Sequence, residues 1–262
     1  MPLVSTKTMF EAAQKGRLPE LITLQDIRGD LHAHTTLTDG RHSLEQMVAA
    51  AKERGYEYLA ITEHSKRVTM ARGLDAKSLA QRNEEIDNLN DKLEGIVLLK
   101  SIEVDILKEG SLDLPDEILK ELDLTVGAIH YDTKLSRKKQ TDRIIRAMDN
   151  PYFNILAHPT GRLINERFPY EVDVERLLEA AKERGCCMEL NAHPDRLDLS
   201  DRFCKTAKEM DVKIAISTDA HSKTDLEFMR FGVYQGRRGW LEVEDVLNTN
   251  SLTKLKKLIE RK

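Results

Sequence analysis

The chain has 262 residues, which is enough for one large α/β domain or two small ones. Hydrophobic residues make up 40% of the sequence and can form a core, while 33% are charged and the net charge is −4. This balance excludes a protein whose surface is basic throughout, the simplest kind of nucleic-acid binder, but it allows a local basic patch.

The cysteines and the hydropathy pattern favour a cytoplasmic protein. Cys186, Cys187 and Cys204 lack C-x-x-C spacing, and we expect buried free thiols of the kind found in a reducing cytosol. No apolar segment approaches the roughly 18 residues that span a membrane. The N-terminus also lacks the apolar stretch of a signal peptide.

Apolar runs alternate with amphipathic helical patterns from about residue 28 onward. Seven strands are expected, over Ile27–Leu31, Tyr58–Thr62, Ile96–Ile102, Leu124–Ile129, Phe153–Ala157, Cys186–Leu190 and Lys213–Ser217. Six helices are expected, over Ser43–Arg54, Ala76–Lys92, Ser136–Asn150, Asp173–Arg184, Arg202–Met210 and Leu252–Arg261. This alternation is typical of parallel strands joined by crossover helices, and seven such strands suit a barrel better than a short open sheet. Function in such barrels sits at the C-terminal ends of the strands.

Local signals mark some of the boundaries. Ser43 followed by Gln46 is typical of a capping box, and Gly185 is one of three glycines that stand where helices should end. Residues 1–27 are interpreted as a lead-in segment, with a helical turn or two over 10–15, and residues 28–262 as the single α/β domain.

Six of the eight histidines stand at or just past the ends of the apolar runs. The clusters read D-L-H-A-H (His32, His34), I-T-E-H (Glu63, His64), S-I-E-V-D (Glu103, Asp105), G-A-I-H (His130), L-A-H-P (His158) and S-T-D-A-H (Asp219, His221). Residues i and i+2 of an extended strand point to the same face, so the two members of H-A-H aim together, as do those of D-A-H. A lone histidine is usually hydrogen-bonded without a metal, but six at strand ends indicate one metal site built from many strands.

Five positions need separate interpretation. Glu63 and His64 are adjacent and face opposite ways in an extended strand, so His64 is the expected ligand and Glu63 either supports it from behind or lines the pocket. Asp39 lies in T-L-T-D-G, where it is either a ligand or simply a turn residue. Glu103 ends an apolar run and could bridge two cations. His193 follows a strand in E-L-N-A-H-P and either lines the pocket, where it would bind the substrate, or lies outside it.

Nine candidate ligands are too many for one ion, so two or three divalent ions are expected. The candidates are His32, His34, Asp39, His64, Glu103, His130, His158, Asp219 and His221. Imidazole and carboxylate together suit zinc, manganese or iron. Clustered divalent ions suit phosphate-ester hydrolysis by metal-activated water, which requires no side-chain nucleophile. No G-x-S-x-G, P-loop or G-x-G-x-x-G motif is present.

These motifs, in this order, resemble the polymerase and histidinol phosphatase (PHP) family of metal-dependent phosphoesterases. The resemblance covers roughly residues 25–260 and rests on H-A-H at 32–34, T-E-H at 62–64, Glu103, I-H at 129–130, H-P at 158–159 and D-A-H at 219–221. Stretches such as D-I-R-G-D-L-H-A-H-T-T and N-A-H-P-D-R-L-D-L look closest to the C-terminal PHP domain of bacterial and archaeal family X DNA polymerases. One departure is T-E-H, where the family usually has T-D-H.

The resemblance implies a distorted, TIM-like (β/α)7 barrel with three ions. Carried over by position, the first ion would be held by His32, His34, Glu103 and Asp219, the second by Glu103, His130 and His158, and the third by Asp39, His64 and His221. It also implies manganese-dependent 3′–5′ exonuclease or 3′-end processing of DNA, with zinc or iron as alternative metals. The remaining 27 residues cannot hold a polymerase, so a polymerase module acting in trans is a candidate partner.

Cationic residues near the expected strand ends are candidates for binding the phosphate. They are Arg162 in H-P-T-G-R, Arg196, Arg237 and Arg238 in a loop flanked by glycines, and the cluster Lys134, Arg137, Lys138 and Lys139. That cluster either contacts the backbone of single-stranded DNA or is a solvated helix start. Tyr131 either stacks on a base or packs at the rim.

Three functions are compatible with these residues. The first is a phosphodiesterase that trims DNA 3′ ends, which the family X motifs favour. The second is a small-molecule phosphomonoesterase, such as a histidinol-phosphate phosphatase, which could use the same metals. The third is a non-enzymatic barrel, which should have lost ligands, whereas each carried-over position here has a competent one.

Overall fold

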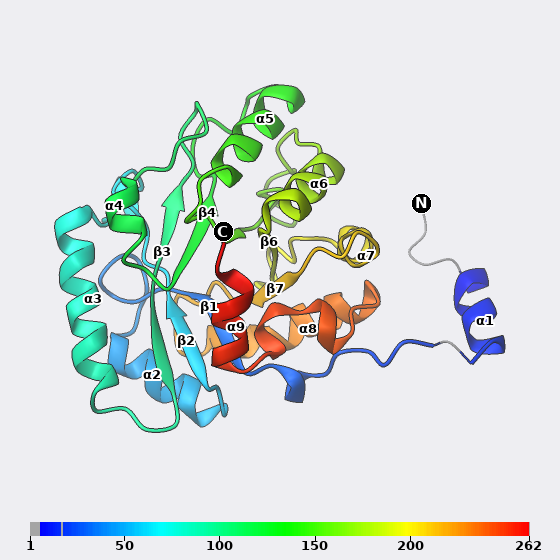
Figure 1. Cartoon of the computed structure of the whole chain (residues 1–262), viewed down its shortest axis with the longest axis horizontal. Helices are drawn as coiled ribbons and strands as arrows, with labels where there is room; N and C mark the ends of the chain where they lie inside the picture. The colour runs from blue at the N-terminus through cyan, green and yellow to red at the C-terminus, as the bar shows by residue number, and fades with distance from the viewer. Residues whose placement is uncertain (1–5, 17, 262) are drawn as a thin grey trace.

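The computed structural model describes residues 6–16 and 18–261 of the chain. Within this part, seven parallel strands follow one another around a nearly closed barrel in the order β1 to β7 (Figure 1). The strands are β1 (Gly29–Ala33), β2 (Tyr58–Ile61), β3 (Val97–Asp105), β4 (Leu124–Ala128), β5 (Ile155–Leu156), β6 (Cys187–Asn191) and β7 (Ile214–Ser217). All seven predicted strands are therefore present, and so is the predicted barrel.

The described part of the chain contains nine α-helices, and most of them connect the strands and cover the outside of the barrel (Figure 1). They are α1 (Thr6–Gln14), α2 (Leu44–Glu53), α3 (Ala76–Asn90), α4 (Asp116–Leu119), α5 (Arg137–Met148), α6 (Val174–Arg184), α7 (Asp201–Glu209), α8 (Met229–Arg238) and α9 (Leu252–Ile259). The predicted capping box is confirmed at the start of α2, where Ser43 and Gln46 each accept a hydrogen bond from the other's backbone N–H. Gly185 ends α6 in the left-handed conformation, as predicted.

Helix α8 corrects one prediction, because the G-R-R-G stretch expected to be a loop is the end of this helix. Two glycines within this helix made it hard to predict from the sequence, since glycine disfavours helices. At Gly232, a Cβ atom would lie 2.5 Å from Cγ2 of Ile216 and 2.7 Å from Cβ of Ala192. The glycine therefore lets α8 pack directly against the barrel wall, and this tertiary contact outweighs local propensity.

The lead-in segment contributes to the core beyond the predicted helical turns. Ile22 is fully buried and its N–H donates to the Leu241 carbonyl at 3.0 Å. Leu21 forms an antiparallel bridge with Glu242. Residues 21–27 thus pack on the barrel, whereas α1 stands apart from it in Figure 1.

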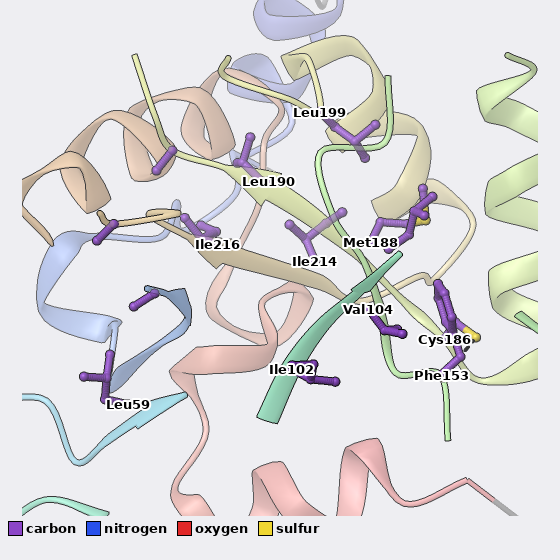
Figure 2. Packing of buried hydrophobic residues seen from close by; sticks show 14 of the residues in the cluster. Leu59, Ile102, Val104, Phe153, Cys186, Met188, Leu190, Leu199, Ile214 and Ile216 are labelled. Atoms are coloured by element: carbon purple, nitrogen blue, oxygen red, sulfur yellow. Dashed lines mark hydrogen bonds between the residues drawn. The ribbon is translucent and has the colours of Figure 1, made fainter. Parts of the chain in front are cut away.

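Two hydrophobic clusters follow the two faces of the strands. Ile155, Cys187 and Ala215 belong to a cluster that also contains Leu255 and Ile259 of α9. Their sequence neighbours along the strands belong to the larger cluster beneath the surrounding helices, and Figure 2 shows labelled members of it such as Leu190, Met188 and Ile216. Helix α9 therefore packs against the inner cluster and closes one end of the barrel, which leaves the carboxyl ends of the strands free for a site.

The predicted buried free thiols are confirmed, and the hydropathy of the described helices is consistent with the sequence pattern. Cys186, Cys187 and Cys204 are buried free thiols, and burial raises the pKa of Cys187 to about 12. No described helix is both long and apolar enough to cross a membrane.

Isolated hydrogen bonds join β1 to β7 and the residues after it, across the remaining gap in the barrel. Ala33 and Ala220 form a parallel bridge, and the N–H of His34 donates to the Ala220 carbonyl at 2.8 Å. The buried Asn248 side chain joins the same two strands, since its Nδ2 donates to the carbonyls of Gly29 and Ile216, both at 2.8 Å. Its Oδ1 accepts from the Ile216 N–H at 3.0 Å, so the side-chain amide of Asn248 bridges the backbones of β1 and β7.

Replacing Asn248 with Ala should destabilise the fold, because three buried backbone groups would lose their partners. Each unpaired group costs about 1–3 kcal/mol, so the free energy of unfolding in urea should fall by roughly 3 kcal/mol or more. The control is Asn150→Ala, which removes a surface bond to Asp116 and one from the Tyr152 N–H, and should cost about 2 kcal/mol or less. Equal losses in the two variants would contradict the closing role of Asn248.

Candidate metal centre

The two oxygens of the Glu103 carboxylate lie among five imidazole rings. Oε1 is 3.0 Å from Nε2 of His158 and 3.4 Å from Nε2 of His130. Oε2 is 2.8 Å from Nδ1 of His64, and the Nε2 atoms of His32 and His34 lie 3.5 and 3.7 Å from it. Glu103 lies near the carboxyl end of β3 and is 1% exposed, and the five rings reach it from the carboxyl ends of β1, β2, β4 and β5.

Two further carboxylates extend the cluster toward solvent. Oδ1 of Asp219 lies 3.2 Å from Nε2 of His34 and 3.6 Å from Nε2 of His32. Oδ2 of Asp39 lies 3.2 Å from Nε2 of His64, and Oδ1 lies 3.5 Å from Nε2 of His221. Asp39 and His221 are about one-third exposed, so they form the outer part of the cluster.

All nine predicted ligands come together, and three groups of them could each hold a metal ion. These groups are His34, Asp39, His64 and His221; His32, His34 and Asp219; and His64, Glu103 and His130. They differ from the ion sets that the resemblance implies in three ways. Glu103 is not part of the group with His32, His34 and Asp219, and His34 also faces the outer group. His64 rather than His158 groups with Glu103 and His130, although His158 touches the same Glu103 oxygen. The assignment of residues to individual ions stays a prediction.

The chemistry of the buried atoms fits divalent cations. Nε2 of His32, both ring nitrogens of His34, Nδ1 of His64 and Oε2 of Glu103 are buried without a hydrogen-bond partner. Orphaned buried polar atoms are costly unless something else satisfies them. Here they face one another, and imidazole nitrogens with carboxylate oxygens are ordinary ligands of zinc, manganese and iron.

The electrostatics of the cluster show what a cation would replace. Burial opposes charge on His64, but the attraction of Glu103 and Asp39 outweighs it and raises the pKa of this ring to about 10. For His34, burial together with the nearby His221 and His64 lowers the pKa to about 3. Glu103 is buried, yet the surrounding imidazoles hold its pKa well below its usual range. Without a metal, protons on some rings balance the carboxylates, and ligation must displace those protons.

Two acidic residues that sequence reasoning did not assign hold the imidazoles in place. Oε1 of Glu189, in β6, is 2.7 Å from Nδ1 of His32, and its Oε2 accepts from the N–H of His158 at 2.6 Å. Oδ1 of Asp105, in β3, is 3.2 Å from Nδ1 of His130. Carboxylates on the far nitrogen of a ligating histidine fix its orientation and raise its basicity. Their signal in the sequence was an acidic residue within an otherwise apolar strand.

Glu63 lies behind the cluster rather than in it. The Oγ1 atoms of Thr35 and Thr38 donate to it, and a guanidinium nitrogen of Arg82 lies 3.2 Å from its Oε1. Glu63 is fully buried, and these contacts anchor the loop that leads to Asp39. Glu63 does not line the cavity over the cluster, and its side chain supports the loop of Thr35 and Thr38 rather than His64.

A cavity of about 580 Å³ opens over the cluster and contains two arginines. It is lined by seven of the predicted ligands and by Val68, Met70, Ala71, Tyr131, Arg167 and Arg196. Nε of Arg196 lies 3.4 Å from Oδ2 of Asp219. Arg167, which the sequence did not single out, donates from Nε and Nη2 to the Gly161 carbonyl at 3.0 and 2.7 Å.

The other predicted phosphate-binding residues do not reach this cavity. Nε of Arg162 donates to the Arg196 carbonyl at 2.7 Å, and its Nη2 donates to the Leu197 carbonyl, so Arg162 braces the loop that carries Arg196. The exposed Lys138 pairs with Asp142 on α5. The ring of His193 packs edge-on against Phe228, with centroids 5.0 Å apart.

Arg237 and Arg238 also have other partners than a substrate. Nη1 of Arg237 donates to the Ile22 carbonyl at 2.9 Å, and Nε of Arg238 donates to Asp201 at 2.8 Å. Both residues therefore tie α8 to neighbouring segments of the fold.

A seven-stranded barrel with histidines and carboxylates at the strand ends is the architecture of a metal-dependent hydrolase. Residues 30–193 match the family model of the PHP domain. This chain belongs to the PHP domain family and is a metal-dependent phosphoesterase.

Two curated relatives with different names support the assignment to this family. The chain is 42% identical over 242 residues to "DNA polymerase/3'-5' exonuclease PolX" of Bacillus subtilis (strain 168), a match that covers 92% of this chain and 42% of that protein. It is 31% identical over 244 residues to a "Probable phosphatase" of Thermoanaerobacter sp. (strain X514), covering 89% of this chain and 94% of that protein. The chain thus spans less than half of the first relative and nearly all of the second.

Solved structures share the fold. The putative histidinol phosphatase of Listeria monocytogenes superposes with a TM-score of 0.61 at 15% identity, covering 76% of this chain and 97% of that one. The histidinol phosphate phosphatase of Lactococcus lactis, solved with zinc, L-histidinol and phosphate, superposes with a TM-score of 0.55 at 14% identity, covering 80% and 93%.

Replacing Glu103 with Gln should remove metal ions from the protein, because the buried anion that the five imidazoles share would become neutral. We expect the chelator-stripped wild type to take up more than one Mn²⁺ per chain by elemental analysis, and the variant to take up fewer. Saturating metal at about 100 times Kd should stabilise the wild type by about 2.7 kcal/mol, which is measurable as a rise in Tm.

The control is Glu85→Gln, which alters an exposed carboxylate paired with Arg82 and should bind metal like the wild type. Equal metal content in Glu103→Gln and the wild type would contradict the central place of Glu103.

Proposed function

We propose that this phosphoesterase cleaves phosphodiesters of DNA and trims 3′ ends, as a manganese-dependent 3′–5′ exonuclease or 3′-end processing enzyme in DNA repair. The observation that carries the proposal is the buried imidazole and carboxylate cluster around Glu103, beneath a cavity that also holds Arg167 and Arg196. The choice of DNA rests on the 42% identity to PolX, which exceeds the 31% identity to the probable phosphatase.

The ligands we propose are the nine residues of the cluster, with Glu103 shared between ions. Bound divalent ions would lower the pKa of water, clamp the phosphoryl oxygens and stabilise the leaving oxygen. Glu189 and Asp105 would keep His32 and His130 oriented toward the ions. None of the described residues that line the cavity is Ser, Thr, Cys or Lys, and its carboxylates and imidazoles are the proposed metal ligands, so we propose metal-activated water rather than a side chain as the nucleophile.

Arg196 and Arg167 are the groups we propose for binding the non-bridging oxygens of the phosphate. Arg196 is held against Asp219, and Arg167 is held against a backbone carbonyl, so both guanidinium groups have defined positions beside the cluster. A polymerase module is the partner we propose for placing the DNA, because the PolX protein that this chain matches is named as a DNA polymerase as well as an exonuclease.

A small-molecule phosphomonoesterase is the second candidate. The observation that favours it is the 31% identity to a probable phosphatase, a match that extends over 94% of that protein. The Lactococcus structure with L-histidinol and phosphate suggests histidinol phosphate as the substrate to test, with zinc as the alternative metal. The same cluster could serve either reaction, so substrates must separate them.

A 5′-labelled single-stranded oligonucleotide incubated with the protein and Mn²⁺ should be shortened stepwise from its 3′ end. Turnover of bis-(p-nitrophenyl) phosphate should also exceed that of p-nitrophenyl phosphate, because the proposed substrate is a diester. An intact oligonucleotide, together with rapid turnover of histidinol phosphate or of the monoester, would exclude the first function in favour of the second.

Asp219→Ala and His34→Ala should each lower hydrolysis by about a thousandfold or more, since each removes a proposed metal ligand and metal-activated water carries the reaction. Circular dichroism should show that the fold persists. Asp91→Ala at the exposed end of α3 is the control and should keep wild-type activity. Full activity in either ligand variant would refute the metal assignment.

A further inference from the structure

Two large apolar side chains are almost fully exposed beside the metal cavity. Met70 is 93% exposed and Phe168 is 92% exposed, while the next most exposed large hydrophobic residue described is Phe10 at 67%. Met70 lines the cavity itself, and Phe168 directly follows Arg167, which lines it. Single exposed apolar residues are ordinary on a protein surface, but here the two extreme cases border the same site.

The loop that carries Phe168 is held in a fixed conformation. Leu163 and Arg167 exchange backbone hydrogen bonds of 2.9 and 2.8 Å, which makes a tight hairpin with Asn165 in the left-handed region at its turn. The N–H of Ile164 donates to the Asp195 carbonyl at 2.6 Å, and the guanidinium of Arg167 holds the Gly161 carbonyl. The ring of Phe168 is therefore presented to solvent by a braced loop.

This hairpin encloses a second, smaller cavity that adjoins the first. The second cavity has a volume of about 370 Å³ and is lined by residues 162–169, including the apolar side chains of Leu163, Ile164 and Phe168. Arg167 lines both cavities. A cationic group thus stands between the metal cluster on one side and an apolar subsite on the other.

Met70 lies on a different loop of the same mouth. It is the middle residue of the short 3-10 helix Thr69–Ala71, which follows β2, and Val68 and Ala71 also line the cavity. The phosphate-binding part of the cavity therefore has an exposed thioether on one of its walls and the Phe168 hairpin beyond Arg167.

We propose that Phe168 and Met70 bind the bases of a single-stranded DNA 3′ end while its terminal phosphodiester lies at the metal cluster. This inference rests on the proposed DNA function and names the residues that recognise the DNA. A nucleic acid is the phosphate ester that combines anionic groups with flat apolar faces at regular spacing. Base stacking on aromatic side chains contributes about 1–3 kcal/mol per base and tolerates any base sequence. Thioether sulfur also makes favourable contacts with aromatic rings.

The test compares two oligonucleotides that differ only in whether the last two nucleotides at the 3′ end carry bases or are abasic. Phe168→Ala should lower kcat/KM for the normal end by about tenfold, in line with the loss of one stacked base. Met70→Ala should lower it by a smaller factor. Neither variant should change kcat/KM for the abasic end, where no base is present to stack.

Three further measurements exclude a merely structural effect. Metal content and Tm should stay at wild-type values in Phe168→Ala, because the side chain packs against little of the fold. Phe168→Trp should restore cleavage of the normal end, since it restores a ring. Tyr234→Ala removes an aromatic side chain that is 59% exposed on α8, away from the cavity, and should leave both substrates unaffected.

The outcomes separate this inference from the proposed function. If the wild type shortens the normal oligonucleotide but Phe168→Ala and Met70→Ala cut it as fast as Tyr234→Ala does, the base subsite is refuted and the exonuclease function stands. Equal losses on normal and abasic ends would refute it as well. If the wild type cuts no oligonucleotide yet hydrolyses small phosphate esters, both the exonuclease function and the subsite are overturned.

Discussion

A carboxylate buried among imidazoles is the interaction on which this structure depends. Glu103 is 1% exposed and faces five histidine rings from its two oxygens. Placing an anion in the interior costs several kcal/mol unless opposite charge surrounds it. The parallel strand order meets that need, because the carboxyl ends of β1, β2, β4 and β5 lie on the same side of the barrel as that of β3 and carry the rings that reach Glu103. Glu189 and Asp105 then fix two of those rings from behind.

Stability and chemistry occupy opposite ends of the barrel. Helix α9 packs Leu255 and Ile259 against the inner cluster, and Asn248 joins β7 to β1. The carboxyl ends of the strands hold charge instead of apolar contacts, together with buried atoms that have no hydrogen-bond partner. Such a centre destabilises the fold when no metal is bound, and the apolar packing at the other end of the barrel offsets this cost. Metal ions would satisfy the same buried atoms, which couples metal binding to folding.

The fold and the ligand set could be predicted from the sequence because both follow from short-range patterns. Apolar runs gave seven strands, and H-A-H and D-A-H placed their paired side chains by strand geometry. The features that the sequence did not predict depend on contacts between residues that are far apart in the chain. Helix α8 was concealed by Gly232, which is required by its contact with Ile216. Arg162 was predicted to bind phosphate because it closely follows His158. A hairpin reverses the chain after it, so Arg167 lines the cavity and Arg162 donates to backbone carbonyls. The grouping of rings around each ion depends on distances that no spacing rule supplies, as His34 and His64 show.

The most direct test of Glu103 as a shared metal ligand is a crystal structure of the protein soaked in Mn²⁺, with anomalous diffraction data collected at the manganese edge. We expect anomalous peaks within bonding distance of both Glu103 oxygens, flanked by the ring nitrogens of His32, His64 and His158. A cluster with no anomalous peak at saturating Mn²⁺, or peaks that avoid Glu103, would contradict this role of Glu103.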